Sequence, residues 1–535
     1  MGAVSEKVAI IGAGIGGLTS AALLASRGFD VTVFEKESWV GGKAREVDVG
    51  GAKVAGGPTV FTMRDVFDGV FRECGARLSD YVDVYQAEVI ARHAWSETER
   101  LDLFADPIRS EEAIGDFAGA KAAKGYRNFR HEARRIFEVL DKPFLRGKSA
   151  NTPFPMMWRI GFWRVDAMLA MRPFDNYWKA LGKHFPDPRL QQLFGRYSTY
   201  CGSSPYEAPA TLMLIAHTEA RGVWVIDGGI HALAKALRTL AESKGASIRT
   251  GCEVARVLAS SGKAAGIELA NGEQITADMV IANSDPSALA AGYLGKAAQP
   301  SVKPLPPKKR SLSALLWYGH AETSGFPLQH HNVFFSPDYA REFREIASGQ
   351  PPSDPTAYLC AMDRSAAHRT GRPAGALVQQ DGAQSEGRER FQIIVNAPAN
   401  GDTHEYTQQE RDQCTKAMRK SLERCGLTLE DPMEHSLATP QEWESLFPAS
   451  GGALYGRASH GWAASFQRQG PRTRMKGLYC AGGATHPSAG VPMAALSGIL
   501  AANTLVQDRA SMRRFLPAVI PGGTSMRSAM TGNTG

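Results

Sequence analysis

The chain has few of the features that define disulfide-rich, metal-binding or membrane-spanning proteins. Its seven cysteines are scattered, odd in number and free of any CxxC pair, which predicts reduced, mostly buried thiols in a cytoplasmic protein. The 13 histidines form no HExxH motif and no paired Cys/His spacing, so we expect no metal site. No window of about 18 uncharged apolar residues occurs, so we expect no helix that spans a membrane.

A concentrated run of positive charge is also missing. The formal net charge is +7 over 535 residues, without a Lys/Arg cluster. This balance argues against a nucleic-acid partner and is compatible with docking on anionic lipid. The short polar stretch 1–7 predicts no secretory signal. A chain of this length predicts two or three domains.

The first 35 residues contain a motif typical of dinucleotide binding. A short buried strand, VAII at 8–11, is followed by GAGIGG, a helical pattern and a second strand that ends at Glu35. Gly12 permits a tight turn, Gly14 lets a pyrophosphate approach the backbone, and Gly17 lets helix and strand pack closely. Glu35 lies where an acid accepts hydrogen bonds from ribose hydroxyls. The alternative is a tight turn that binds nothing.

The residues after Glu35 favour FAD over NAD. A second glycine pair, Gly41 and Gly42, precedes Lys43 and Arg45, where an NAD domain would begin its next helix. Such a loop suits a long extended cofactor, and the segment GGPTVFT at 56–62 is expected near its ring system. The alternative is that Lys43 and Arg45 are solvated surface charges.

A second strand–loop–helix pattern lies at 477–500, GLYCAGGATHPSAGVPMAALSGIL. The start of its helix could direct a positive dipole end toward a flavin. Between the two ends, 247–286 is expected to add strands to the same domain, with Val254 near the adenine. The alternative for 477–500 is an ordinary strand–helix unit.

Together these blocks resemble the flavin-containing amine oxidase and phytoene desaturase superfamily. GAGIGG…FEKESWVGGKAR and GLYCAGGATHPSAGVP narrow the resemblance to the carotenoid desaturases. The stretches GGPTVFTMRDVFD, YSTYCGSSPYEAPATLMLIAHTEARGVWVIDGG and VPMAALSG resemble the branch acting on 1-hydroxycarotenoids, the 3,4-desaturases also called methoxyneurosporene dehydrogenases. The resemblance covers nearly the whole chain except roughly the last 20 residues.

The resemblance implies an α/β fold. It consists of a Rossmann-like FAD-binding domain that is discontinuous in sequence, an α+β substrate domain and a helical, membrane-facing part. The expected ranges are 1–90, 220–300 and 465–512 for FAD binding, 91–219 for the helical substrate part, 301–464 for a substrate-binding sheet, and 513–535 for a flexible tail.

The motifs and the resemblance together predict the residues that hold the cofactor. They come from the two glycine loops, the acid after the second strand and the segment that follows it. The predicted FAD contacts are Gly12, Gly14, Gly17, Glu35, Lys36, Gly42, Lys43, Arg45, Gly57, Pro58, Thr59, Val254, Gly482, Gly490, Val491 and Met493.

Two departures from the family pattern lie in the carboxy-terminal loop. The usual HPGAG turn has Ser488 in place of a glycine, which would cost roughly 1 kcal/mol if that backbone had a positive φ. Amine oxidases place an acid in this loop, where this chain has Thr485 and His486. The second departure counts against amine oxidation.

Residues 154–178, FPMMWRIGFWRVDAMLAMRPFDNYW, are unusually rich in aromatic residues and Met, which make up 11 of the 25 positions. A carotenoid lives in the bilayer, so its enzyme must dock on lipid and offer an apolar tunnel. Aromatic rings, Met and three arginines (Arg159, Arg164 and Arg172) suit such a surface. The alternative is a buried helix of the substrate domain.

The expected reaction is a two-electron desaturation, in which a hydride passes to flavin N5 and a neighbouring carbon loses a proton. Glu219 and His217 are candidates for the base or for binding the hydroxyl end; the alternative is that both are structural. The electron acceptor is expected to be oxygen or a quinone. Other possibilities are a phytoene desaturase, a retinoid saturase, an amine or porphyrinogen oxidase, or a non-enzymatic relative that binds prenylated proteins.

Overall fold

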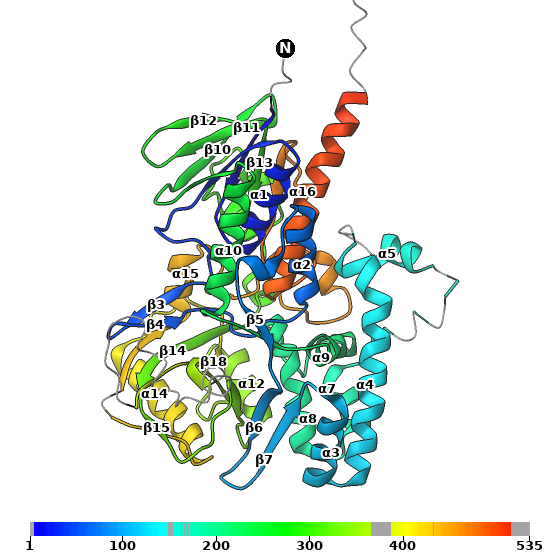
Figure 1. Cartoon of the computed structure of the whole chain (residues 1–535), viewed down its shortest axis with the longest axis vertical. Helices are drawn as coiled ribbons and strands as arrows, with labels where there is room; N and C mark the ends of the chain where they lie inside the picture. The colour runs from blue at the N-terminus through cyan, green and yellow to red at the C-terminus, as the bar shows by residue number, and fades with distance from the viewer. Residues whose placement is uncertain are drawn as a thin grey trace, which may run out of the picture.

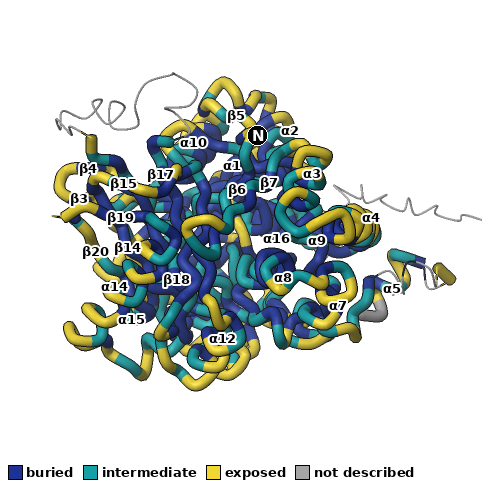
Figure 2. The backbone as a smooth tube through the Cα atoms, turned by 90° about the horizontal axis from the view of Figure 1, so that it is seen from below, coloured by how far each residue is buried: buried dark blue, intermediate teal, exposed yellow. Residues whose placement is uncertain are grey.

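The computed structural model describes residues 5–147, 153–161, 163–164, 167, 171–364, 387–431 and 433–514 (Figure 1). Its upper part, as drawn in Figure 1, contains both ends of the described chain, and its lower part contains a large sheet beside a group of helices. Buried segments run through the centre of the molecule, as Figure 2 shows from below.

A five-stranded parallel sheet joins segments that are distant in sequence. Its order is β21-β13-β1-β2-β9. Strand β21, near the carboxy-terminal end, therefore pairs with β13, which in turn pairs with β1 near the amino terminus. After the exposed Lys7, the strands β1, β13 and β21 are buried on both faces, as parallel strands usually are, whereas the edge strand β9 is partly exposed. The strands are β1 (Lys7–Ile11), β2 (Asp30–Phe34), β9 (Ser247–Arg249), β13 (Met279–Ala282) and β21 (Leu478–Cys480).

The two faces of this sheet pack against different layers. Val8 and Ile10 of β1 belong to a core shared with the helices α1 (Ile15–Ser26), α10 (Gly229–Ser243) and α16 (Val491–Arg514). Ala9 and Ile11 point to the other face, because successive strand residues alternate. There they pack on a small antiparallel sheet, β10 (Val254–Ser260), β11 (Lys263–Leu269) and β12 (Gln274–Thr276).

A seven-stranded mixed sheet forms the lower part, in the order β20-β14-β18-β17-β16-β6-β7. Leu359 and Ile393 face a core that includes α14 (Gln408–Glu423). Their neighbours Tyr358 and Ile394 therefore point to the opposite face, which borders the large cavity described below. The strands are β6 (Val89–Ala94), β7 (Arg100–Phe104), β14 (Ser313–Ala321), β16 (His331–Phe334), β17 (Ala357–Ala361), β18 (Glu389–Ala397) and β20 (Glu434–Ala438).

Helices between β7 and α10 lie beside this sheet (Figure 1). The longest, α4, buries Phe129, Ile136 and Phe137 along one side and contacts α3, α7 and α9. The elements are α3 (Pro107–Ala118), α4 (Ala120–Leu140), α5 (Pro153–Ile160), α7 (Tyr177–His184), α8 (Pro188–Gly195), the short helix η3 (Arg196–Cys201) and α9 (Leu214–Ala220).

Several element predictions match the structure and others lie outside the described residues. The sequence also predicts strands at 311–321, 356–363 and 390–398, and these correspond to β14, β17 and β18. The predicted tail begins two residues too early, because α16 continues to Arg514, and the rest of it is not described. The polar stretch 364–389 is also predicted to be a loop; most of it, and part of 154–178, lies outside the described ranges. Among the helices of the described ranges, none is both long and apolar enough to cross a bilayer.

Candidate active site

The first glycine loop has no room for side chains. Gly12 has a φ of +95°, and its N–H donates to the Phe34 carbonyl at 2.7 Å. A Cβ on Gly17 would lie 2.3 Å from the Gly12 carbonyl oxygen, and one on Gly14 would lie 2.7 Å from Asn283 Nδ2. The start of α1 has no side-chain cap, so its first N–H groups can receive a phosphate.

Glu35 lies beside this loop at the end of β2. Its carboxylate is buried and accepts hydrogen bonds from the backbone N–H groups of Ala13, at 2.7 Å, and Glu37, at 3.1 Å. Burial raises the pKa of Glu35. The Glu35 carbonyl accepts from the Cys252 N–H at 2.8 Å, which brings the strand beginning at Val254 close to the acid.

The second glycine pair packs on the first loop. The Gly41 N–H donates to the Ala13 carbonyl at 2.8 Å. Lys43 is half-buried, its ammonium donates to the Leu454 carbonyl, and burial lowers its pKa to about 8. Arg45 lies over the Trp443 ring, 5.4 Å from its centroid. Neither base is a fully solvated surface charge, whereas Lys36 is exposed and pairs with Glu37 at 3.6 Å.

The carboxy-terminal loop meets the amino-terminal one. A Cβ on Gly16 would lie 2.9 Å from the Gly482 backbone nitrogen, and one on Gly498 would lie 2.3 Å from the Gly16 carbonyl oxygen. Gly482 has a φ of +116° and donates to Ser497 Oγ at 2.6 Å. Helices α1 and α16 therefore approach each other through backbone, and the two distant motifs form one cleft.

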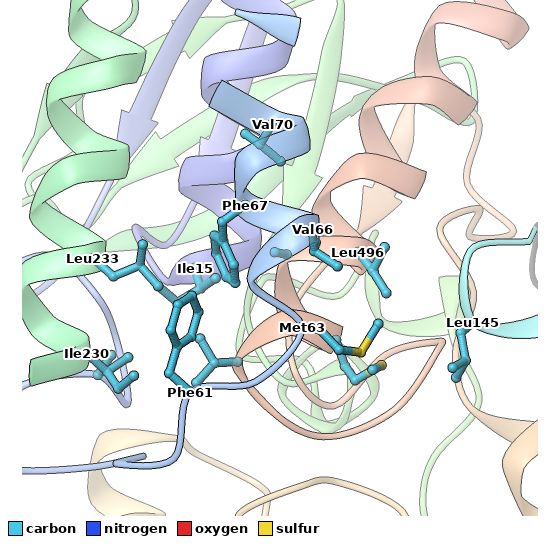
Figure 3. Packing of buried hydrophobic residues seen from close by; sticks show 14 of the residues in the cluster. Ile15, Phe61, Met63, Val66, Phe67, Val70, Leu145, Ile230, Leu233 and Leu496 are labelled. Carbon is cyan, nitrogen blue, oxygen red and sulfur yellow. The ribbon is translucent and has the colours of Figure 1, made fainter. Parts of the chain in front are cut away.

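The segment that contains Gly57, Pro58 and Thr59 completes this cleft. A Cβ on Gly57 would lie 1.7 Å from the Lys43 carbonyl oxygen, so only glycine fits there. Pro58 and Thr59 border the same cavity as Gly490, Val491 and Met493 at the start of α16. Figure 3 shows how the chain beyond Thr59 packs against α16 through Met63, Val66 and Leu496.

Unpartnered polar atoms indicate that the cleft is shaped for a polar ligand. Asn283 lies between the loops, with Nδ2 donating to the Gly12 carbonyl at 3.3 Å and Oδ1 unpartnered. Among the described residues, Trp39 Nε1, Arg45 Nε, Ser284 Oγ and Asp285 Oδ2 are also buried without a hydrogen bond. An FAD fits this donor set and the close glycine backbone. Asn283, Ser284 and Asp285 were not among the predicted contacts, although they directly follow a buried strand.

A cavity of about 1390 Å³ adjoins the cleft at Pro58, Thr59 and residues 488–493. It exceeds the roughly 300–1,000 Å³ of a typical small-molecule site. Its wall combines residues of the helical part and the seven-stranded sheet, and most are apolar. Apolar side chains on its wall include Leu140, Phe144, Met156, Met171, Leu212, Ile215, Ile394 and Phe466.

The two candidate acid–base residues occupy different surroundings. Glu219 borders the cavity and is buried, which raises its pKa. Both of its carboxylate oxygens are engaged, one by Tyr197 Oη and the other by Tyr200 Oη at 3.0 Å. His217 is not among the described residues that border the cavity. It packs against Phe137, and burial lowers its pKa to about 4.

A second polar group on the cavity wall was missed from the sequence. Arg196 lies between the rings of Tyr200 and Tyr358, 5.2 Å from each centroid. Tyr358 Oη forms hydrogen bonds of 2.7 Å with Thr59 Oγ1 and with His331 Nδ1. These residues come from four separate segments, and no local pattern distinguishes them.

Behind Tyr358, three side chains with metal-ligand atoms cluster in the seven-stranded sheet. The candidate ligand atoms of His330, His331 and Cys360 lie within 4.8 Å of one another. Cys360 Sγ lies 3.6 Å from His330 Nε2. Since His331 Nδ1 already binds Tyr358, we interpret the cluster as support for that tyrosine.

Ser488 fits its turn without strain. It is not among the non-glycine residues with a positive φ. Serine in place of the family glycine therefore causes no backbone strain at this position. Its hydroxyl lies 3.7 Å from Cys201 Sγ, which connects η3 to the carboxy-terminal loop.

Exposed aromatic side chains lie on and near the described part of 154–178. Trp158 and Trp163 are each 71% exposed and Phe174 is 79% exposed. The Phe174 ring lies 5.6 Å from that of Trp462, and both residues border the cavity. Arg172 is a structural residue, because it pairs with Glu132 and Asp175 at 2.6 Å. Its guanidinium is therefore held by two carboxylates of the protein, and contact of Arg172 with lipid stays a prediction.

Comparisons with known proteins agree with this geometry. The family described as flavin containing amine oxidoreductase matches residues 15–506. The chain is 48% identical to a hydroxyneurosporene desaturase of Rubrivivax gelatinosus, over 99% of this chain and 98% of the relative. It is 42% identical to the hydroxyneurosporene desaturase of Cereibacter sphaeroides, over 96% and 99%.

A solved structure supports the fold alone. An oxidoreductase from Methanosarcina mazei superposes with a TM-score of 0.58 at 18% identity, covering 92% of this chain and 99% of its own.

Proposed function

The chain belongs to the flavin containing amine oxidoreductase family, and from this premise we propose that it is an FAD-dependent desaturase of an acyclic, 1-hydroxylated carotenoid. The new double bond would join C3 and C4. The main supporting observation is that the first glycine loop packs against the carboxy-terminal loop, and that the end of this second loop, Ser488 to Met493, borders a large apolar cavity. Two relatives that match almost the whole chain are hydroxyneurosporene desaturases.

The glycine loops and their neighbours would hold the cofactor. Gly12, Gly14 and Gly17 would receive the pyrophosphate, and Glu35 the adenosine ribose. Pro58, Thr59 and the start of α16 border the cavity where a ring system must meet substrate. Bound FAD supplies the two-electron acceptor, taking a hydride from one carbon while the neighbouring carbon loses a proton.

The protein's own contribution is alignment and exclusion of water. The apolar wall excludes water from the polyene, whose conjugation stabilises the positive charge that develops as hydride leaves. Glu219 is a poor candidate for the direct base, because two tyrosines donate to its carboxylate. Its position suggests a role in holding Tyr200 and in balancing the charge of Arg196.

Substrate delivery requires a membrane, because a carotenoid is insoluble in water. Trp158, Trp163 and Phe174 would enter the interface next to the cavity, as aromatic side chains commonly do. All seven cysteines are free thiols, which supports a cytoplasmic, peripheral position. Oxygen or a quinone of the same membrane would accept the electrons.

The membrane proposal is tested by vesicle sedimentation. Replacing both Trp158 and Trp163 with Ser should reduce binding to anionic liposomes at least about tenfold, since each ring buries substantial apolar area. The matched control is Trp443→Phe, a buried ring far from this surface. Equal binding of wild type and the double variant would refute this docking surface.

The activity is tested with liposomes that contain 1-hydroxyneurosporene. We expect a red-shifted product with one more conjugated double bond, and no product from phytoene. Conversion of phytoene would instead identify a phytoene desaturase. A purified protein without flavin absorbance, which converts neither, would favour a non-enzymatic binding protein.

A further inference from the structure

A charged side chain on the wall of an apolar cavity is energetically costly unless polar groups or a ligand interact with it. Arg196 is such a residue, and in the described part of the chain it forms no ion pair. Its guanidinium makes one hydrogen bond, to Tyr200 Oη at 3.1 Å. Because arginine has five N–H donors, most of its hydrogen-bonding capacity remains for something in the cavity.

The second polar element next to Arg196 is a short chain of hydrogen bonds. Tyr358 Oη joins Thr59 Oγ1 on one side and His331 Nδ1 on the other. His331 is buried, and its Nε2 has no hydrogen-bond partner among the residues that the structure describes. Tyr358 and Thr59 border the cavity, so the chain ends in groups that a ligand can reach.

Both elements lie at the cofactor end of the cavity. Thr59 lies two residues after Gly57, which packs closely on the Lys43 carbonyl. Arg196 and Tyr200 belong to η3, whose last residue, Cys201, contacts Ser488. A 3₁₀-helix rises about 2 Å per residue, so Arg196 is roughly 10 Å along the helix from that contact.

The proposed substrate needs a polar contact at this end. The hydroxyl is on C1 and the new double bond joins C3 and C4, so only C1 and C2 separate the oxygen from the reacting carbons. A group that recognises the hydroxyl must therefore lie next to the cofactor rather than at the far end of the cavity.

We propose that Arg196 and Tyr358, with Thr59 behind them, form the receptor for the C1 hydroxyl and select hydroxylated over unsubstituted acyclic carotenoids. The inference rests on the proposed function. Arg196 donates to the hydroxyl oxygen, while the Tyr358–Thr59 pair accepts its proton in a hydrogen bond. Glu219, which accepts from Tyr200, balances the arginine charge without an ion pair that would consume its donors.

Selection follows from the cost of leaving these groups unpaired. A substrate without the hydroxyl buries the receptor against hydrocarbon, whereas the hydroxylated substrate satisfies it. Binding also fixes the position of C3 and C4 along the cavity, because a polyene by itself offers no feature that would stop it from sliding.

The test compares Tyr358→Phe with Tyr455→Phe in the full-length, FAD-loaded protein. Both tyrosines border the cavity, but no described residue hydrogen-bonds to Tyr455 Oη. The measured quantity is the ratio of kcat/KM for 1-hydroxyneurosporene to that for neurosporene, both in liposomes. Dissociation constants from flavin difference spectra replace kcat/KM if neurosporene is not converted.

We expect Tyr358→Phe to lower this ratio about tenfold, corresponding to one lost hydrogen bond, and Tyr455→Phe to leave it unchanged. Thr59→Val, which keeps the shape of the side chain, should lower the ratio about threefold. It serves as the second variant if Tyr358→Phe fails to fold or to retain flavin.

Two outcomes would overturn the proposal. One is that Tyr358→Phe and Thr59→Val keep the wild-type kcat/KM for both carotenoids. The other is an equal loss with both carotenoids, which would make these residues general supports of the cavity. Failure of the proposed function is distinguishable, because wild type would then neither bind nor convert either carotenoid.

Discussion

The cofactor loops and the cavity beside them are built in opposite ways. In the loops, a single Cβ on Gly17 would approach the Gly12 carbonyl to 2.3 Å. In the cavity, large side chains leave a volume of about 1390 Å³. The loops hold a ligand by close backbone approach, whereas the cavity holds one by shape and a few polar contacts. A larger side chain should therefore weaken FAD binding and stability when it is placed in the loops, but should impair only carotenoid conversion when it is placed in the cavity.

The largest effect is expected from Gly17→Ala. The new methyl group collides with backbone that cannot move without displacing α1, so we expect at least a 100-fold loss of FAD affinity and a large drop in Tm. Flavin absorbance per protein and thermal unfolding measure these changes.

The control for this variant is Gly69→Ala in α2 (Arg64–Glu73), where a Cβ meets nothing within 4 Å. Alanine is the better helix former, so stability should rise by up to about 1 kcal/mol. Equal flavin content in Gly17→Ala and Gly69→Ala would contradict the proposal that close packing of the glycine loop is needed for FAD binding.

The converse experiment adds atoms to the cavity. Ile215 in α9 borders it and is half-buried, so the indole of Ile215→Trp can be accommodated in the empty volume. We expect about a 100-fold loss of carotenoid conversion with normal flavin content and a Tm within a few degrees of wild type. Product formation and flavin absorbance separate the two effects.

Ile108→Trp provides the matched substitution outside the cavity, because Ile108 is 65% exposed in α3. Conversion by this variant should equal that of wild type. Loss of flavin in Ile215→Trp would show that a larger side chain in the cavity also disturbs FAD binding in the cleft, so that the two regions do not respond separately.

A third prediction concerns a buried carboxyl group that accepts a hydrogen bond from Thr356, a residue of the cavity wall. Glu342 lies in α12 (Tyr339–Ala347), is buried, and accepts from the Thr356 N–H at 3.0 Å. Burial raises its pKa to about 7 from an ordinary 4.5. Its stabilising contribution is therefore fully present below pH 4.5 and is lost as the pH rises through 7.

Between pH 5.5 and 8.5 this loss amounts to about 2 kcal/mol of unfolding free energy. Glu342→Gln should remove that part of the pH dependence, as urea unfolding at the two pH values would show. In Glu345→Gln, on the same helix, the dependence should persist. There burial is outweighed by hydrogen bonds from Ser353 and by Arg341, so the pKa of Glu345 is lowered.

The smallest effect is expected from Ser488→Gly, which restores the family glycine. Since Ser488 does not have a positive φ, glycine gains nothing in the fold and adds freedom to the unfolded chain. We expect a loss of up to about 1 kcal/mol in stability and unchanged flavin content. Tighter flavin binding by this variant would mean that the turn changes when the cofactor is bound.

The residues that were predictable from the sequence share a local cause. Gly12, Gly14 and Gly17 are constrained by a turn between adjacent elements, and the spacing of those elements is visible in the chain. The same holds for the short apolar strands β1, β13 and β21, each followed by a loop rich in glycine or small polar residues. Such constraints act within about 30 residues and leave a recognisable pattern.

Other residues of the candidate site could not be found in this way. Tyr358 borders the cavity because the alternation of β17 directs it away from Leu359, and either direction would suit the sequence. Asn283 is placed between the loops by the register of β13 against β1. Arg196 follows an ordinary helix, and its sequence gives no sign that its guanidinium lies between two tyrosines.

The sequence by itself determined the cofactor motifs, the family and the apolar character of the substrate part, because each depends on residue type and short-range spacing. Only the tertiary structure decided which polar side chains meet in the cavity and whether Glu219 and His217 reach it. Those relations depend on contacts between strands and helices more than 100 residues apart, for example the 2.7 Å hydrogen bond from Thr59 to Tyr358. Such contacts are fixed by packing, which no short segment encodes.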